Sequence, residues 1–305
     1  MYSVAVMMST YNGEKYLREQ IESILNQKDV SVYLYIRDDG SQDNTLEILN
    51  DYKKSNSNIF IEKGDNVGPA KSFMKCFYAT PTIYDFYAFS DQDDIWYDNK
   101  LIEACKMLEA NDEKEIYYCN SMLVDSFGKE LDLRFHDIPE MSAFGVFCGE
   151  NFAFGCHVVF SKSFKELIES DARRPDNSLF DRRMHDVWFS LIGLITNSII
   201  YDERPFICYR QHDNNVVGAY GKSFKTVLKT RLAKLRNKER RNVRSLTASE
   251  LVRKYGDYIV RYPEIERSAD INTFKGKMNL IKHYKDFREY DSFIKFSLYV
   301  LLGLF

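Results

Sequence analysis

The chain has 305 residues, of which 45% are hydrophobic and 29% are charged. These ordinary proportions exclude a collagen-like chain, a wholly disordered chain and a membrane protein with several spans. The length predicts one large domain, or one domain with an appendage.

The net charge of −3 is unevenly distributed along the chain. Residues 222–244 contain ten Lys and Arg and one acidic residue, a net of +9, so the remainder nets −12. Such a basic segment indicates a polyanionic surface, and no nucleic-acid-binding motif accompanies it. We therefore expect a membrane partner and no nucleic acid; the alternative is a solvated helical face.

The cysteines and the chain ends indicate a cytoplasmic protein. The six cysteines form no C-x-x-C pair, which is typical of a reducing compartment. The N-terminus lacks a basic region followed by an apolar one, so we expect no signal peptide. The apolar segment 293–305 is too short to span a bilayer.

The first 120 residues alternate strand-like and helix-like segments, which predicts βαβ units and a mostly parallel sheet. Strands are expected at Ser3–Met8, Val30–Arg37, Asn58–Glu62, Tyr84–Ser90 and Glu115–Cys119. Helices are expected at Glu14–Gln27, Asn44–Lys54, Ala70–Ala79 and Asn99–Ala110. Beyond residue 121 the pattern loosens: we expect a helix at Val187–Ile195, closing strands at Ser198–Tyr201 and Pro205–Tyr209, and a helical end from Lys222.

An acidic run, Asp91-Gln92-Asp93-Asp94, follows the fourth predicted strand. Ligands bind beyond the carboxyl ends of the strands in parallel sheets. Carboxylate oxygens that gather there suit Mg²⁺ or Mn²⁺, which neutralise a diphosphate. The alternative is an acidic turn that caps the next helix, which the position after an apolar strand disfavours.

A second polar loop, Arg37-Asp38-Asp39-Gly40-Ser41-Gln42-Asp43, follows the second strand. A carboxylate there can accept the imide N–H of uracil or thymine, which cytosine does not offer. Asp43 or Ser41 is also suited to cap the next helix.

A third polar cluster, Ser9-Thr10-Tyr11-Asn12-Gly13, ends the first strand, where a tyrosine can line a base pocket. The three clusters, in this order, resemble the glycosyltransferase family 2 pattern on the GT-A fold: S-x-Y-N, then D-D-G-S-x-D, then D-x-D-D. The resemblance covers residues 2 to about 217. Gln42 departs from it, since the family often has Thr there.

Further segments sharpen the likeness. Asn66-Val67-Gly68 matches an N-x-G element, and Gly155-Cys156 resembles an acceptor-side G-C segment. Residues 184–188, M-H-D-V-W, resemble the motif whose Asp is the catalytic base. Residues 209–217, Y-R-Q-H-D-N-N-V-V, resemble an element of bacterial rhamnosyltransferase-like members.

The resemblance implies a role for each matching residue. The residues expected to bind the nucleotide sugar are Thr10, Tyr11, Asn12, Asp38, Asp39, Asn66, Lys71, Asp91, Gln92 and Asp93. Asp93, with His212, is expected to hold Mg²⁺ or Mn²⁺, and Asp186 to act as general base. The acceptor side is expected to include Gly155, Cys156, His185, Trp188 and Arg210.

The histidines and tryptophans among these residues also have structural explanations. A histidine is more often structural, so His212 is as well explained by a structural role, and His185 at most orients the base. Trp96 and Trp188 are expected in the core or a pocket wall rather than stacked on sugar.

The resemblance implies an inverting glycosyltransferase. Residues 1–220 form the GT-A catalytic domain, with a nucleotide-binding half at 1–120 and an acceptor-binding half at 121–220. Beyond the resemblance, the charge pattern predicts that residues 221–305 are a basic helical extension, which we expect at the inner face of the bacterial membrane. The implied donor is dTDP-β-L-rhamnose, and the implied acceptor is a lipid-linked or growing cell-surface polysaccharide.

Three alternatives stay open at this stage. A UDP-hexose donor (galactose, glucose or N-acetylglucosamine) fits the same motifs. A non-catalytic membrane scaffold of a polysaccharide assembly complex is the non-enzymatic alternative. The apolar end at 293–305 has either the membrane or a second copy of the chain, in a homodimer, as its partner.

Overall fold

The computed structural model describes residues 1–148, 155–212, 243–271, 273–287 and 292–302. They form two compact units, one of residues 1–140, 155–170 and 197–212, the other of residues 141–148, 171–196, 243–271, 273–287 and 292–302. The second unit therefore takes in two segments before the predicted boundary at residue 220. No helix among the described residues combines the length and apolar character needed to cross a bilayer.

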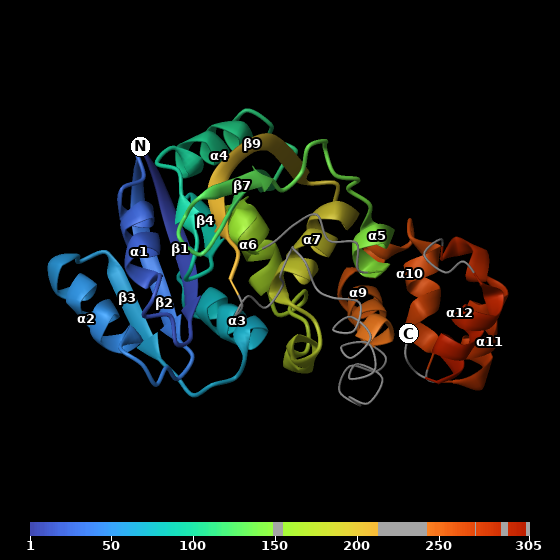
Figure 1. The fold of residues 1–305 in the computed structure, drawn as a ribbon. Helices are drawn as coiled ribbons and strands as arrows, with labels where there is room; N and C mark the ends of the chain where they lie inside the picture. Colours follow the sequence, from blue (N-terminus) through green and yellow to red (C-terminus); the bar gives the residue numbers. More distant parts are fainter. Residues whose placement is uncertain (149–154, 213–242, 272, 288–291, 303–305) are drawn as a thin grey trace. The chain divides into compact units, whose positions relative to one another are not determined.

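The first unit is built on one mixed sheet with nine strands among the described residues (Figure 1). The strand order is β3-β2-β1-β4-β8-β6-β9-β5, and β7 pairs with β6. The strands are β1 (Tyr2–Thr10), β2 (Val30–Asp38), β3 (Ile59–Lys63), β4 (Phe86–Ser90), β5 (Ile95–Trp96), β6 (Ile116–Val124), β7 (Glu130–Leu133), β8 (Val158–Ser161) and β9 (Ile199–Arg210).

The sheet is parallel from β3 to β4, as the strand–helix alternation predicts, and it is mixed beyond β4. β3, β2, β1 and β4 are parallel, and β6 is parallel to β9. β8 runs antiparallel to both β4 and β6. β7 pairs antiparallel with β6, and β5 pairs antiparallel with β9. Two consecutive parallel strands need a long crossover connection, usually a helix. The strand–helix alternation stops after β6, and the short turn that follows β6 makes β7 antiparallel to it. The two predicted closing strands are one strand, β9.

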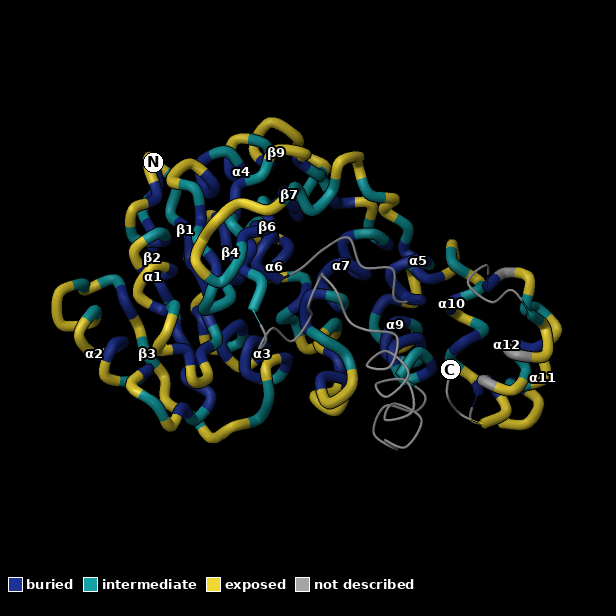
Figure 2. The backbone as a smooth tube through the Cα atoms, in the orientation of Figure 1, coloured by how far each residue is buried: buried dark blue, intermediate teal, exposed yellow. Residues whose placement is uncertain are grey.

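Helices cover both faces of the sheet in the first unit. Val4, Val6 and Met8 share a core with α1 (Leu17–Leu25), α2 (Thr45–Ser55) and α4 (Lys100–Glu109). On the opposite face, Phe89 packs against Phe73 of α3 (Pro69–Ala79) and Phe160, and α6 (Lys162–Glu169) also packs there. β1 and β4 are buried on both faces, as Figure 2 shows, so their polar ends open only at the sheet edge.

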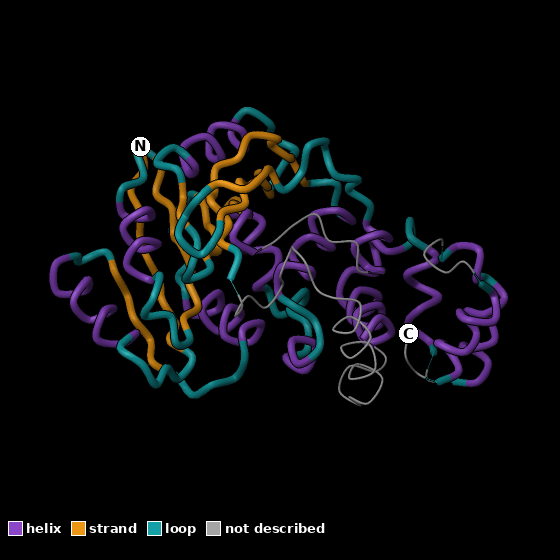
Figure 3. Tube along the Cα trace, viewed as in Figure 1, coloured by secondary structure: helices purple, strands orange, loops and turns teal. Residues whose placement is uncertain are grey.

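The second unit is helical over its described residues (Figure 3). Its elements are α5 (Ala143–Cys148), η2 (Asn177–Asp181), α7 (His185–Ile195), α9 (Val243–Ile259), α10 (Pro263–Arg267), η4 (Ser268–Asp270), α11 (Phe274–Lys282), η5 (Tyr284–Asp286) and α12 (Phe293–Leu301). The predicted basic helix lies almost entirely outside the described residues, and so does the end of the predicted apolar segment.

Candidate functional site at the carboxyl edge of the sheet

The loop after β1 is fixed by the loop after β4. Gln92 Oε1 accepts a hydrogen bond from Tyr11 N (2.9 Å), and Gln92 Nε2 donates to Tyr11 O (3.1 Å). A Cβ on Gly13 would lie 2.3 Å from Gln92 Oε1, so only glycine permits this approach. Asn12, at φ +48°, accepts from Gln42 N at 2.8 Å. These contacts leave the Tyr11 side chain 47% exposed at the sheet edge, as a binding wall requires.

Asp38 is buried, and both of its carboxylate oxygens accept hydrogen bonds from the chain around it. Thr10 Oγ1 and Ser41 Oγ donate to Oδ1 at 3.1 and 2.5 Å, and Gly40 N and Ser41 N donate to Oδ2 at 3.2 and 3.0 Å. Gly40 has a φ of +82°, which glycine adopts without strain. Asp38 thus shapes the turn that follows β2.

Asp39 is equally buried and joins three segments. Arg37 Nη1 and Val67 N donate to its Oδ1 at 2.5 and 3.0 Å, and Gly68 N donates to Oδ2 at 2.9 Å. The Arg37 and Asp39 side chains are 1% and 3% exposed. This pair fixes the loop with Asn66 before α3, which carries half-buried Lys71 in its first turn.

The acidic loop after β4 leaves its side chains closer to solvent. Asp91, Gln92 and Asp93 are half-buried, and only Asp94 is fully buried. His212 Nε2 lies 2.8 Å from Asp93 Oδ2, so the structure brings together the two residues predicted as metal ligands. The His212 ring also packs on Tyr16, with 5.2 Å between ring centroids.

Arg210, predicted on the acceptor side, lies against the acidic loop. Its backbone N donates to Asp94 Oδ1 at 3.2 Å, and its Nε donates to Asp93 O at 2.9 Å. Its Nη2 pairs with Glu19 Oε2 at 2.5 Å, and its guanidinium lies 4.5 Å from the Tyr16 ring centroid. One buried arginine thus connects β9, α1 and the acidic loop, and holds Asp93 in place.

Asp91, Asp94 and Cys156 each place a ligand atom within 4.8 Å of the others. Asp94 Oδ2 is buried and has no hydrogen-bond partner of normal geometry among the described residues. Burial, with Asp93 and Asp91 nearby, raises the pKa of Asp94 well above its usual value. Burial and the nearby carboxylates also raise the pKa of the Cys156 thiol. Cys156, predicted on the acceptor side with Gly155, therefore lies beside the acidic loop.

A buried lysine stands behind this loop. Lys100 is fully buried, its Nζ lies 3.5 Å from the centre of the Trp96 ring, and its ammonium has no hydrogen bond within the described residues. Burial lowers its pKa to about 8, and the nearby Cys156 and Asp94 oppose that shift. Trp96 is a core residue, as predicted.

The residues predicted around the catalytic base lie in the second unit. Asp186 is the second residue of α7, is 8% exposed, and its Oδ1 accepts from Val187 N at 2.7 Å. Burial lowers the pKa of His185 to about 3, so this imidazole is neutral at ordinary pH. Trp188 is fully buried against Tyr255, which supports its interpretation as a core residue.

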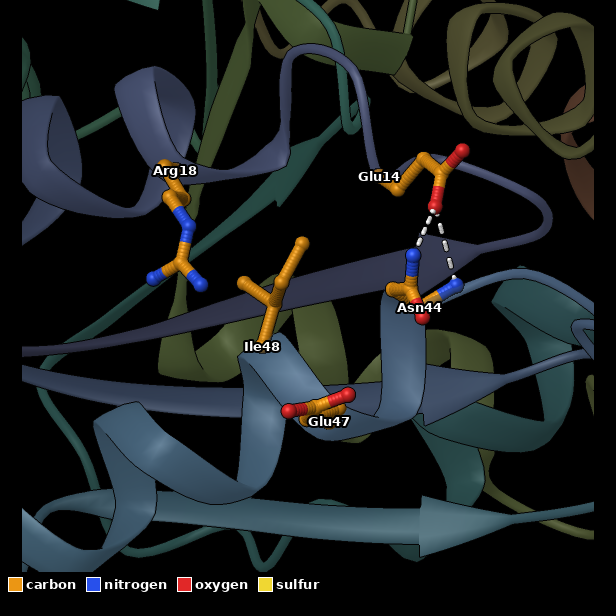
Figure 4. Close-up of a pocket in the computed structure, with 5 residues that line it drawn as sticks. All are labelled: Glu14, Arg18, Asn44, Glu47 and Ile48. Atoms are coloured by element: carbon orange, nitrogen blue, oxygen red, sulfur yellow. Dashed lines mark hydrogen bonds between the residues drawn. The ribbon is translucent and has the colours of Figure 1, made fainter.

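A shallow depression of about 380 Å³ lies between α1 and α2, and none of the predicted site residues lines it. It is lined by Glu14, Arg18, Asn44, Glu47 and Ile48, and Figure 4 shows Glu14 turned toward Asn44. Glu14 Oε2 accepts from both Asn44 N and Asn44 Nδ2, at 3.0 and 2.7 Å. These contacts join the segments that follow β1 and β2, and they hold the start of α2.

Sequence reasoning missed several residues that organise this edge. Arg37 and Asp94 stand within the predicted motifs, so their neighbours offered a signal for them. Glu19, Tyr16 and Lys100 stand in or beside helices, and nothing in the local sequence marks them. Their importance depends on which strands become neighbours.

The matches to known proteins agree with this geometry. The family model described as "Glycosyl transferase family 2" matches residues 5–164, just over half of the chain. The chain belongs to glycosyltransferase family 2. This membership makes it a glycosyltransferase, and a non-catalytic scaffold is no longer needed to explain its motifs.

Relatives within glycosyltransferase family 2 include a named rhamnosyltransferase. The chain is 35% identical over 241 residues to the dTDP-rhamnosyl transferase RfbG of Shigella flexneri, covering 76% of this chain and 80% of that protein. It is 26% identical over 232 residues to EpsH of Bacillus subtilis, named as a glycosyltransferase, covering 72% of this chain and 64% of EpsH.

Solved structures share the fold. The S. aureus TarS 1–349 complex with UDP matches with a TM-score of 0.55 at 16% identity, over 83% of this chain and 66% of that one. The TarS complex with UDP-GlcNAc matches with a TM-score of 0.54 at 16% identity, over 93% and 80%. Together these likenesses support the GT-A fold expected from the motifs.

Proposed function

We propose that the chain transfers L-rhamnose from dTDP-β-L-rhamnose, with inversion, to a lipid-linked or growing cell-surface polysaccharide. The observation that carries this proposal is the 35% identity to a dTDP-rhamnosyl transferase over most of both chains. The carboxyl edge of the sheet supports it, because the polar ends of β1, β2 and β4 meet there beside half-buried Asp91 and Asp93.

The nucleotide end of the donor is proposed to lie between the loops after β1 and β2. Tyr11 offers an exposed ring to the base, and Asn12 and Thr10 stand beside it at the end of β1. Asp39 Oδ2 accepts one hydrogen bond, from Gly68 N, so this oxygen has a second lone pair for the imide N–H of thymine. Asp38 contributes by holding the turn that carries Asp39.

The acidic loop fits a divalent cation. Asp91 and Asp93 offer hard oxygen ligands, His212 offers a nitrogen beside Asp93, and buried Asp94 adds a carboxylate beside the Cys156 thiol. Such donors suit Mg²⁺ or Mn²⁺. Bound there, the cation would neutralise the diphosphate of the donor. Arg210 holds the loop for that purpose by its bonds to Asp93 O and Asp94 Oδ1.

Asp186 is proposed as the general base that takes the proton of the acceptor hydroxyl as the hydroxyl attacks the anomeric carbon. Asp186 lies in the first turn of α7, where its Oδ1 accepts a hydrogen bond from Val187 N. His185, neutral and buried beside it, adds no competing charge.

The base is tested by Asp186→Asn, which keeps the shape and removes proton acceptance. Transfer should slow by about 10²–10⁴-fold with donor affinity unchanged. Asp171→Asn, an exposed change in the same unit, is the control and should leave the rate unaltered. An equal loss of donor affinity would make Asp186 a donor-binding residue instead.

The donor is tested by thermal unfolding with nucleotide diphosphates and Mg²⁺ or Mn²⁺, because a ligand that binds the folded state raises Tm. Thymidine and uridine diphosphates should raise Tm, and cytidine diphosphate should not. An equal rise with cytidine or guanosine diphosphate would remove the assignment of the base pocket.

A UDP-hexose is the second candidate donor. It is favoured by the UDP and UDP-GlcNAc complexes of TarS, a protein that shares the fold. The imide N–H of uracil equals that of thymine, so the hydrogen bond to Asp39 does not separate them. Competition between dTDP-rhamnose and the UDP-hexoses for turnover does separate them.

We also propose that the enzyme works at the inner face of the cell membrane, where a lipid-linked acceptor is found. The basic segment 222–244 supports this placement through its charge of +9. Anionic headgroups attract such segments by about 1 kcal/mol per nearby cation, and salt weakens that attraction.

A further inference from the structure

The helix α12 is apolar on two opposite faces. Phe296 and Val300 are fully buried, and Phe296 packs on Phe287 with 4.9 Å between ring centroids. On the opposite side, a row with helical spacing is exposed: Ile294, Leu298, Leu301 and Leu302 are 70%, 51%, 45% and 60% exposed. A globular protein normally buries one apolar stripe of a helix and leaves polar residues opposite it. The second stripe of α12 is therefore exposed and open to a partner.

The neighbouring helix α11 exposes apolar and basic residues on one face. The exposed fraction is 75% for Phe274 and 45% for Met278, one turn further on. Lys275 and Lys282, three residues before and four after Met278, lie beside them and are also exposed. Figure 2 shows exposed segments along α11. The two helices pack together, and Lys277 Nζ donates to Leu301 O at 3.1 Å.

The charge around these helices is positive. Residues 271–302 contain six Lys and Arg and three acidic residues, a net of +3. Earlier in the sequence, the segment 222–244 carries a net of +9. An apolar face beside lysines is the composition of a helix that lies in the interface of an anionic bilayer. Lysine stems lie along apolar surface while the ammonium groups reach the headgroups.

We propose that the exposed faces of α11 and α12, with Lys275 and Lys282 beside them, form the surface that docks on the anionic lipid of a membrane. This inference deepens the proposed function, since it names the surface that brings the enzyme to a lipid-linked acceptor. A second copy of the chain fits less well. In a twofold dimer the same patch faces itself, so the lysines would meet like charges.

The test is co-sedimentation of the full chain with two kinds of vesicle, phosphatidylcholine alone and phosphatidylcholine mixed with phosphatidylglycerol. The wild-type chain should bind the anionic vesicles, and less so as salt rises. Ile294→Ser with Leu298→Ser should weaken binding about tenfold or more, because two apolar side chains no longer enter the interface. Both positions are exposed, so we expect the fold to persist, which circular dichroism checks.

Matched controls separate this surface from general stickiness. Phe127→Ser changes a 93% exposed phenylalanine in the first unit and should leave vesicle binding unchanged. Lys275→Gln with Lys282→Gln should weaken binding to anionic vesicles, whereas the exposed pair Lys53→Gln with Lys54→Gln should leave it unchanged.

Three results would overturn the proposal. The first is wild-type binding that the α11 and α12 substitutions leave unaltered, and the second is no binding at all. The third is a wild-type dimer in analytical ultracentrifugation that becomes a monomer in Ile294→Ser with Leu298→Ser. Release of nucleotide diphosphate from the donor, measured without vesicles, separates these outcomes from failure of the proposed function. The rate of nucleotide diphosphate release should be the same in the α11 and α12 variants as in the wild type. A wild type that releases no nucleotide diphosphate would contradict the donor assignment and leave the docking surface untouched.

Discussion

The two acidic loops at the carboxyl edge of the sheet use their carboxylates in opposite ways. Asp38 and Asp39, after β2, are at most 2% exposed, and every carboxylate oxygen accepts a hydrogen bond from the surrounding chain. After β4, Asp93 keeps a side chain 22% exposed and meets His212, and Asp94 lies beside Asp91 and Cys156. The first loop builds the edge, and the second leaves oxygens for chemistry.

This difference teaches that a run of aspartates in a motif is not evidence of a single role. Backbone N–H groups and a short hydroxyl side chain beside Asp38 donate hydrogen bonds to its carboxylate, so this carboxylate stabilises the turn. At the loop after β4, Arg210 donates to Asp93 O and Asp94 Oδ1, and the Asp93 carboxylate meets His212. Substitutions in the two loops should therefore separate activity from stability.

The largest expected effect is on turnover, from Asp93→Asn. Loss of one carboxylate at the proposed cation site removes stabilisation of charge on the leaving diphosphate, and the rate should fall by about 10³-fold. The unfolding temperature should change little, because Asp93 is half-buried. Steady-state kinetics with Mg²⁺ or Mn²⁺ measures this. Asp98→Asn, in an exposed pair with Lys28, is the control; a wild-type rate for Asp93→Asn would refute the assignment.

The next largest effect is on stability, from Asp39→Asn. The substitution leaves the Arg37 guanidinium buried without its charge partner, so the free energy of unfolding should fall by about 3–5 kcal/mol. Urea denaturation measures it. Asp51→Asn breaks an exposed pair with Lys54 and should cost well under about 1 kcal/mol. If both changes cost the same, the buried pair has no special role.

Arg210→Met should have an intermediate effect on activity. Removing a residue that orients ligands typically costs about 10–100-fold in metal affinity or rate. The signature of a positioning role is a higher Mg²⁺ or Mn²⁺ concentration for half-maximal activity, with much of the rate recovered at high metal. A rate loss that no metal concentration restores would instead make Arg210 a direct contact of the substrate.

Lys100→Met should have the smallest effect, and it should be stabilising. Charging a buried lysine is costly, so its removal should raise the free energy of unfolding at pH 7 by about 1–2 kcal/mol. The pKa of Lys100 is about 8 when folded and 10.5 when unfolded, so the folded state binds fewer protons between these values. Stability of the wild type should therefore rise between about pH 8 and 10.5, by up to about 1.4 kcal/mol per unit. Chemical denaturation across this range should show that rise in the wild type and not in Lys100→Met.

The sequence alone determined the parallel half of the sheet and the residues at its carboxyl edge. Alternating apolar and amphipathic segments locate β1 to β4, and three polar motifs fall where those strands end. This information is local, because each motif directly follows its own strand. It was enough to bring Tyr11, Asp39 and Asp93 to one edge, since parallel neighbours end on the same side.

Only the tertiary structure decided what each of those carboxylates meets. Arg210 follows Asp93 by more than a hundred residues, and Cys156 follows Asp94 by more than sixty, yet β9 and the turn before β8 bring both to the acidic loop. The antiparallel insertion of β8 between β4 and β6 has no local signature in the sequence. Pairing across such separations depends on which strands share a buried face, and a strand's own residues do not specify its neighbour.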